Sequence, residues 1–253
     1  MPLPFTSGIS IGIGAAAALG LAAGAFAYAS RWPSSHLFGG TLIAPARPDE
    51  LALTFDDGPN PAWTPQLLDI LAGHGAKATF FLVGQFAERE PALARSIADA
   101  GHLIGNHSWS HPDLSLTTAH RVHEELARTQ DTLEQITGKP VRYFRPPFGA
   151  RRPSVLRDAR GLGMTPVMWN AMTNDWAERS PDRIAERLAK KIDARHRSGT
   201  AANIVLHDGG HLGLNADRGP SVAAAAKLLP RYAATHRFVT VDAWTDETES
   251  RLS

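Results

Sequence analysis

Short apolar runs alternate along this chain with longer stretches in which apolar and polar residues follow a helical period. The short runs predict buried strands and the longer stretches predict helices. We expect strands at residues 51–55, 78–83, 102–105, 141–144, 164–169, 203–206 and 238–241. We expect helices at 64–72, 88–100, 117–137, 152–160, 180–196 and 221–234. Such alternation is typical of a parallel sheet with crossover helices, and about seven units favour a barrel over an open sheet.

Residues that favour helix ends support this assignment. Thr64-Pro65 and Ser180-Pro181 each place a capping residue before a proline in the first helical turn. Thr118 is a candidate cap for the longest helix, and Gly138 follows its end. These positions predict where three of the helices begin.

The first thirty residues carry no charged side chain, and residues 8–29 are almost entirely small or apolar. A helix of that length can cross a bilayer. Ala27-Tyr28-Ala29 resembles a signal-peptide cleavage site, but the basic segment that should precede it is missing. We favour an uncleaved membrane anchor over residues 1–30, against a cleaved signal peptide or a buried alanine-rich helix. Residues 31–47 then form a linker, and residues 48–253 form one exported domain, either anchored to the cell membrane or periplasmic or extracellular.

Composition narrows the possible functions. Hydrophobic residues make up 43% of the chain and charged residues 20%, as in an ordinary globular protein. The 26 Lys and Arg residues nearly balance the 25 Asp and Glu residues, so no excess of positive charge indicates a nucleic-acid partner. Cysteine is absent, which excludes thiolate metal ligands, a cysteine nucleophile and disulfides. Histidine, aspartate and glutamate remain as metal ligands.

Polar residues follow the predicted strands at the positions where parallel α/β folds assemble their sites. Asp56 and Asp57 lie in the segment Thr-Phe-Asp-Asp-Gly-Pro, after the first strand. Neighbouring side chains on a strand point to opposite faces, but at a strand end that enters a turn both carboxylates can reach one cavity. Asp-Gly-Pro is also ordinary turn chemistry, so the pair alone does not indicate a site.

His107 and His111 follow the third predicted strand. Two imidazoles four residues apart can meet on one side of a helical turn and bind one metal ion. Close histidine pairs also occur by chance in a chain with 11 histidines. His120 and His123 are such a pair, and we assign them to a solvated helix face.

Three later strands are followed by further polar segments: Arg-Pro-Pro-Phe-Gly at 145–149, Asn-Asp-Trp at 174–176 and Val-Leu-His-Asp at 205–208. The two prolines of the first segment fix the backbone that carries the Arg145 side chain and the Phe148 N–H group. A single histidine at a strand end, such as His207, is more often structural than catalytic. None of these segments is decisive alone.

The five segments together, in this order, resemble a polysaccharide deacetylase with the NodB homology domain (carbohydrate esterase family 4). The resemblance covers roughly residues 48–245, and Thr-Phe-Asp-Asp-Gly-Pro and His-Ser-Trp-Ser-His-Pro are its most specific parts. It implies a distorted, incomplete (β/α) barrel, which agrees with the alternating pattern of strands and helices.

The resemblance also implies a divalent metal ion as cofactor, with zinc as the expected ion. Asp57, His107 and His111 would bind it. Asp56 would be the general base, and Arg145 would hold the Asp56 carboxylate in its ionised form.

The remaining roles come from the later segments. Phe148 would donate its backbone N–H group to the oxyanion. His207 would be the general acid, with Asp175 orienting its ring. Trp176 would line the sugar groove, and Pro147 would be a further substrate contact.

Two positions depart from the family pattern. Val205, a further expected substrate contact, stands where the family usually has leucine, which is a mild change in an apolar pocket. Met172 stands where an additional aspartate is common, three positions before the Asp-Trp pair. The loss of that polar group weakens inference about the substrate more than about the reaction.

The expected function is therefore metal-dependent removal of acetyl groups from the N-acetylated sugars of a peptidoglycan-like or chitin-like glycan. An O-deacetylase of a xylan-type polysaccharide could use the same residues. The apolar N-terminal segment suggests a lipid-linked sugar at a membrane as a third substrate. A glycan-binding module that has lost catalysis is a non-enzymatic alternative, but it would require a missing ligand or base, and none is missing here.

Overall fold

The computed structural model describes residues 20–21 and 23–245, and its strands form one parallel sheet. The strands are β1 (Glu50–Gly58), β2 (Thr79–Leu82), β3 (Leu103–Asn106), β4 (Tyr143–Phe144), β5 (Thr165–Pro166), β6 (Ala171–Met172), β7 (Ala202–His207) and β8 (Arg237–Phe238). Seven of them follow the order β5-β4-β3-β2-β1-β7-β6, and β8 pairs with the start of β1. The sheet curls into the incomplete (β/α) barrel that the sequence predicts.

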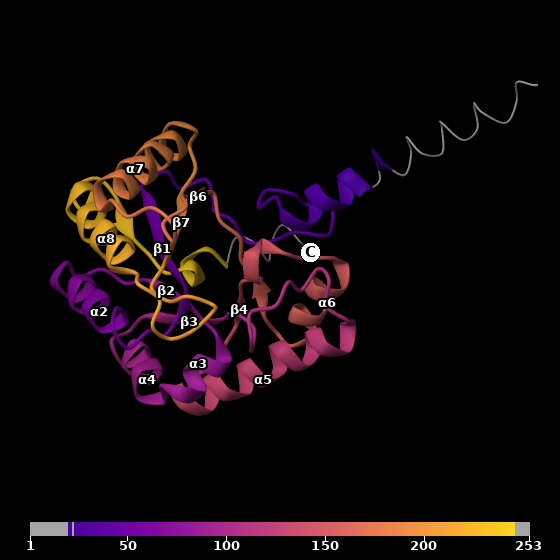
Figure 1. Ribbon diagram of the computed structural model, residues 1–253. Helices are drawn as coiled ribbons and strands as arrows, with labels where there is room; N and C mark the ends of the chain where they lie inside the picture. The colour runs from indigo at the N-terminus through magenta and orange to yellow at the C-terminus, as the bar shows by residue number, and fades with distance from the viewer. Residues whose placement is uncertain (1–19, 22, 246–253) are drawn as a thin grey trace, which may run out of the picture.

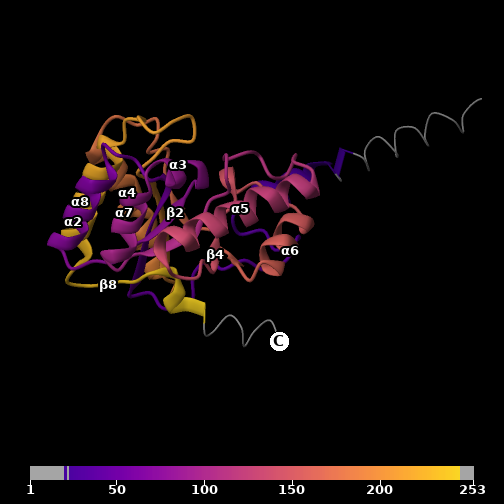
Figure 2. The same cartoon turned by 90° about the horizontal axis from the view of Figure 1, so that it is seen from below.

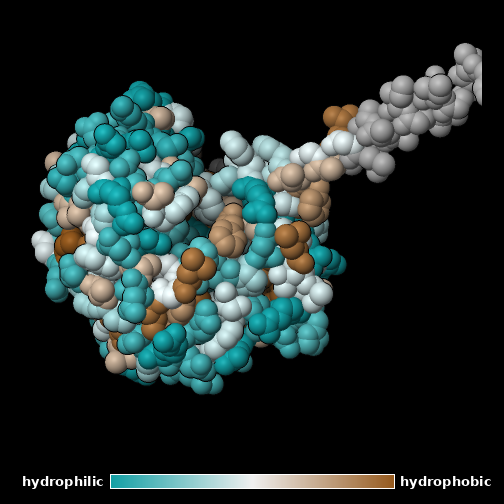
Figure 3. Space-filling view, in the orientation of Figure 1, coloured by the Kyte–Doolittle hydropathy of each residue, from teal (hydrophilic) through white to brown (hydrophobic). Residues whose placement is uncertain are grey.

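Helices lie on the outer side of the strands (Figures 1 and 2). They are α2 (Thr64–Gly73), α3 (Gly84–Arg89), α4 (Pro91–Asp99), α5 (Ala119–Thr137), α6 (Pro153–Gly161), α7 (Pro181–Arg197) and α8 (Gly219–Tyr232). Two short 3-10 helices, η1 (Pro147–Gly149) and η2 (Val241–Trp244), complete the fold. The face seen in Figure 3 is mostly hydrophilic and has a hollow near its middle.

The central strand β1 explains how the barrel separates its core from its site. Leu51, Leu53 and Phe55 alternate along β1 and are fully buried in the main hydrophobic cluster, together with the apolar faces of the helices. Side chains on a strand alternate between faces, so Thr54 and Asp56 point to the opposite, inner face. The inner face of β1 therefore carries polar groups from its middle to its end.

Several predicted elements differ from those observed. The helix expected at 88–100 is two helices, α3 and α4, because Pro91 has no N–H group to continue a helix and instead begins α4. The strand expected at 164–169 is reduced to β5, and β6 follows it separately. Between them Asn170 pairs irregularly with the start of β7: its backbone N donates to Asn203 O at 3.2 Å, its amide oxygen accepts from Asn203 N at 2.9 Å and its Nδ2 donates to Ala201 O at 3.0 Å.

The predicted helix caps are partly confirmed. Thr118 and Ser180 are the N-caps of α5 and α7, and each side chain accepts a hydrogen bond from a backbone N–H group of the first turn. The prediction for Thr64 is wrong, because Trp63 is the N-cap of α2. The Thr64 hydroxyl instead accepts from Asn60 N at 2.8 Å and donates to the buried Asp208 carboxylate.

The N-terminal prediction lies largely outside the described residues. Residues 20–31, with residue 22 excepted, are helical. Over the part of the chain that the structure describes, no helix combines the length and apolar character needed to cross a membrane. The anchor at residues 8–29 stays a prediction.

The domain boundary at residue 48 also stays a prediction, although part of the expected linker packs against the barrel. Leu42 is buried and forms an isolated parallel bridge with Val167. Arg151 is fully buried and donates to the backbone oxygens of Trp32 at 2.7 Å and Ser35 at 3.0 Å. These contacts hold residues 32–42 beside the loop that follows β4.

Candidate active site

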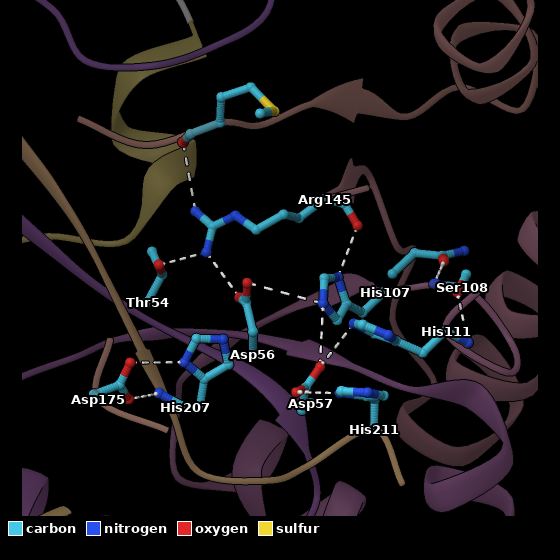
Figure 4. A network of polar contacts seen from close by, with 12 residues as sticks. Thr54, Asp56, Asp57, His107, Ser108, His111, Arg145, Asp175, His207 and His211 are labelled. Carbon is cyan, nitrogen blue, oxygen red and sulfur yellow. Dashed lines mark hydrogen bonds and ion pairs between the residues drawn. The ribbon is translucent and has the colours of Figure 1, made fainter. Parts of the chain in front are cut away.

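A β-bulge at the end of β1 places two adjacent carboxylates in one site. β1 continues past its predicted end to Gly58, and its pairing with β2 shifts register between Asp56 and Gly58. Asp57 lies in this bulge with a φ of 69°. A bulge can redirect a side chain that regular pairing would send to the other face. Figure 4 shows both carboxylates beside His107, whose Nε2 lies 3.9 Å from Asp56 Oδ2 and 3.4 Å from Asp57 Oδ1.

Asp57, His107 and His111 form a buried cluster of potential metal ligands, with one donor atom from each residue within 4.8 Å of the others. Asp57 Oδ1 lies 3.0 Å from His111 Nε2 and 3.4 Å from His107 Nε2. The expectation that the histidines meet on a helical turn is wrong. They lie in an irregular loop, in which Ser108 and His111 have positive φ values of 64° and 59°.

Polar residues that the sequence did not single out hold this loop. Asn106 Oδ1 accepts from Ser108 N at 2.8 Å, and Ser108 Oγ accepts from His111 N at 3.1 Å. Glu125 on α5 is buried and accepts from both the backbone N–H and the hydroxyl of Ser110, each at 2.7 Å. Glu125 lies on a helix whose other charged residues are predicted to face solvent. No pattern in the sequence distinguishes the buried Glu125 from them.

The donor set of the cluster fits a divalent cation, because it combines two imidazoles with one buried carboxylate. His107 Nδ1 lies 2.7 Å from the Arg145 carbonyl oxygen, which can only accept, so Nδ1 is the donor there and Nε2 is the ring nitrogen that faces Asp57. Burial lowers the pKa of His111 despite the neighbouring Asp57. Burial raises the pKa of Asp57, but the His107 and His111 imidazoles hold it well below its usual range. Among the residues that the structure describes, none forms a hydrogen bond of regular geometry with the buried Asp57 Oδ1.

Arg145 fixes the second carboxylate. It follows β4, is fully buried, and donates to Asp56 Oδ1 at 2.8 Å and to Asn203 Oδ1 at 3.3 Å. Its guanidinium carbon lies 4.1 Å from the centre of the Phe81 ring. Burial of this charge is tolerable because the carboxylate pairs with it. Asp56 is thus held in one orientation beside the metal-ligand cluster.

His207 stands next to Asp56, because the two residues are register partners on the neighbouring strands β7 and β1. The Asp175 carboxylate binds His207 twice, accepting from the ring Nδ1 at 2.9 Å and from the backbone N at 2.8 Å. Ser221, another residue that the sequence did not single out, donates to the same carboxylate at 2.6 Å. Burial alone would lower the pKa of His207, but the Asp175 carboxylate and the more distant Asp57 and Asp56 raise it to about 9.

We therefore expect His207 in the metal-free protein to keep its ring proton until about pH 9. A pKa raised on folding means that this proton stabilises the folded state fully below about pH 6.5, and that the stabilisation is lost as pH rises through about 9. NMR titration of the imidazole checks this, with the exposed His120 as an internal reference. In Asp175→Asn the His207 ring should lose its proton at clearly lower pH. An unchanged His207 titration in that variant would contradict the assignment to Asp175.

The remaining predicted residues differ in exposure. Trp176 is 44% exposed, and its ring meets the His207 ring edge-to-face at 5.3 Å. Phe148 is 49% exposed and meets the His111 ring edge-to-face at 4.5 Å. Pro147 and Val205 are buried, Val205 on the same face of β7 as His207. Their contact with substrate stays a prediction.

Backbone conformation marks this site independently. Among the residues that the structure describes, the non-glycine residues with positive φ are Asp57, Ser108, His111 and Phe148. Such conformations cost free energy and persist only where surrounding contacts impose them, often at functional sites. All four belong to the two loops and the bulge described above.

A cavity of about 650 Å³ lies elsewhere, and its walls include Leu42, Arg160 and Trp244. It contains none of the candidate residues. Residues 40–45 form much of its lining, so it reflects how the chain before β1 packs on the barrel. The candidate active site is identified instead by the polar side chains that converge at the ends of the strands.

Comparison with known proteins points to one family. The polysaccharide deacetylase family model matches residues 44–167. A peptidoglycan-N-acetylglucosamine deacetylase of Bacillus cereus is 35% identical over 205 residues, covering 80% of this chain and 70% of the relative. A chitooligosaccharide deacetylase of Azorhizobium caulinodans is 40% identical over 158 residues, covering 62% of this chain and 72% of the relative. The crystal structure of the Bc1960 peptidoglycan N-acetylglucosamine deacetylase superposes with a TM-score of 0.71 at 33% identity, covering 79% of this chain and 90% of that one.

Proposed function

This chain belongs to the polysaccharide deacetylase family, and we propose that it hydrolyses acetyl groups from the N-acetylated sugars of a peptidoglycan-like or chitin-like glycan. The observation that carries the proposal is the arrangement of three groups at one end of the sheet. Asp57, His107 and His111 form the ligand cluster, and Asp56 and His207 stand beside it as neighbours on β1 and β7. A base, an acid and a cation site are the parts that amide hydrolysis requires.

We propose zinc as the ion, because two imidazoles and one carboxylate with an open position are typical of catalytic zinc sites. An ion held there supplies a positive charge that polarises the acetyl carbonyl and makes the attacking water more acidic. Asp56 accepts a proton from that water as the water oxygen attacks the acetyl carbon. The Arg145 guanidinium keeps the Asp56 carboxylate turned toward the reaction.

Two groups from later loops complete the reaction. The Phe148 N–H group donates to the oxygen on which negative charge develops. The protonated His207 ring gives its proton to the sugar nitrogen as the C–N bond breaks, so the products are acetate and a free amine. Asp175 keeps the His207 ring charged and turned toward that nitrogen. The exposed Trp176 offers a flat apolar surface to the sugar ring.

Acetate release from three substrates in parallel tests this proposal. The full chain, loaded with zinc, should release acetate from peptidoglycan or from chitooligosaccharides and leave acetylxylan unchanged. The Asp56→Asn variant provides the background rate. Release from acetylxylan alone would identify an O-deacetylase. Glycan binding by the zinc-loaded chain without acetate release would identify a non-enzymatic module.

A further inference from the structure

The loop after β7 crosses directly over the bulge of β1. Gly209 N donates to Asp56 O at 3.4 Å, and a Cβ atom at Gly209 would lie 2.0 Å from the Asp57 carbonyl oxygen. Only glycine permits this approach. Arg218 Nε donates to Gly209 O at 2.6 Å, which fixes the loop from its other end. The following residues are therefore held against the ligand cluster.

This loop places His211, which belongs to none of the family segments, on top of the cluster. Its ring lies 4.7 Å from the His111 ring with only 18° between their planes, so the two imidazoles are stacked. The Phe148 ring meets His211 edge-to-face at 5.3 Å. His211 Nδ1 is 3.9 Å from Asp57 Oδ2, and Figure 4 shows the ring beside Asp57 and His111. The His211 side chain is 38% exposed.

The two metal-ligating rings differ in what orients them. A ligating histidine usually donates its second ring N–H to a fixed acceptor, which sets the direction of the donor nitrogen. His107 does this through Nδ1 and the Arg145 carbonyl. His111 does not, because its Nδ1 is buried without a hydrogen-bond partner among the described residues. The contacts that remain to orient the His111 ring include the flat face of His211 and the edge of Phe148.

We propose that His211 is a positioning residue that fixes the His111 ring by stacking, as the Arg145 carbonyl fixes His107 by a hydrogen bond. The inference rests on the proposed metal site of Asp57, His107 and His111. His211 is not itself a member of that cluster: the donor atoms that lie within 4.8 Å of one another come from the other three residues. Its effect on the ion is therefore indirect and requires a ring rather than a nitrogen atom.

Zinc affinity in the absence of substrate tests this inference. The full chain is stripped of metal and titrated with zinc in competition with a chromophoric chelator. We expect His211→Ala to weaken zinc binding about 10- to 100-fold, as loss of an orienting partner does in other metal sites. His211→Phe keeps a flat ring and should recover most of the affinity. His120→Ala, which removes a histidine that is 84% exposed on α5, is the matched control and should bind as the wild type does.

Each other outcome decides against the proposal in a different way. Equal zinc affinity for His211→Ala and the wild type would show that stacking does not orient His111. Equal weakening in His211→Ala and His211→Phe would show that the nitrogen matters, so that His211 acts as a ligand. A wild-type chain that binds no zinc would instead overturn the proposed function. Thermal unfolding of each metal-free variant establishes that folded protein is titrated.

Discussion

Asp57→Asn is expected to abolish measurable zinc binding and to reduce acetate release by about 10³-fold or more, because a catalytic ion contributes several kcal/mol and each 1.4 kcal/mol is a factor of ten. The Asp57 carboxylate is the one negatively charged member of the ligand cluster, and its pKa lies well below the usual range. The asparagine amide is neutral and is a weaker ligand. Zinc titration and acetate release measure the two effects separately.

Asparagine is the appropriate replacement because of the backbone at this position. Asp57 has a φ of 69°, a conformation that asparagine adopts more readily than most residues, whereas alanine would be strained there. The variant should therefore fold. Asp131→Asn, the same chemical change at an exposed position of α5, should bind zinc and turn over normally. Normal zinc affinity in Asp57→Asn would remove Asp57 from the metal site.

Much of the site could be predicted because it is built at strand ends. Asp56 lies near the carboxyl end of β1, His207 ends β7 and Arg145 follows β4. The carboxyl ends of parallel strands meet at one rim of the barrel. The apolar runs that locate the strands therefore locate these side chains. The pairing of His207 with Asp175 needs only one further step, since both lie at the ends of neighbouring strand–loop units.

The conformation of the ligands could not be predicted in the same way. His111 has a left-handed backbone conformation. The Ser108 hydroxyl, which accepts from His111 N, supports it within an irregular turn. Glu125 supports the same loop from α5, fifteen residues further along the chain, through its contacts to Ser110. A spacing of four residues indicated a helical turn, which is a local explanation. The actual cause is tertiary, and hydrophobic periodicity carries no information about it.

The position of His211 could not be predicted from the sequence either. Its position follows from the close approach of Gly209 to the Asp57 carbonyl, and a Gly-Gly pair in a sequence indicates only a flexible turn. The split of α3 from α4 is different, because Pro91 alone predicts it. Pro91 is a local signal in the sequence, whereas the position of His211 depends on contacts that exist only in the folded chain.

Asp56→Asn is expected to lower kcat by about 10² to 10⁴-fold, the range that a positioned general base contributes, while zinc affinity stays close to that of the wild type. An asparagine oxygen can still accept the hydrogen bond that Arg145 donates to Asp56 Oδ1 at 2.8 Å. The geometry of the site should therefore persist, and the side chain loses only its capacity to take a proton. Rates measured at saturating zinc isolate this effect from any loss of metal.

The adjacent residues Asp56 and Asp57 then form a matched pair, because the same substitution at each should give opposite results for zinc binding. If the Asp-Asp-Gly-Pro segment were only a turn, both variants would show the same small loss of stability and no specific loss of zinc or turnover. The bulge predicts instead that Asp57→Asn loses the ion and that Asp56→Asn keeps the ion but turns over far more slowly. Near-normal turnover of zinc-loaded Asp56→Asn would place the base elsewhere. In that case the metal site would remain as proposed, but Asp56 would not be the general base.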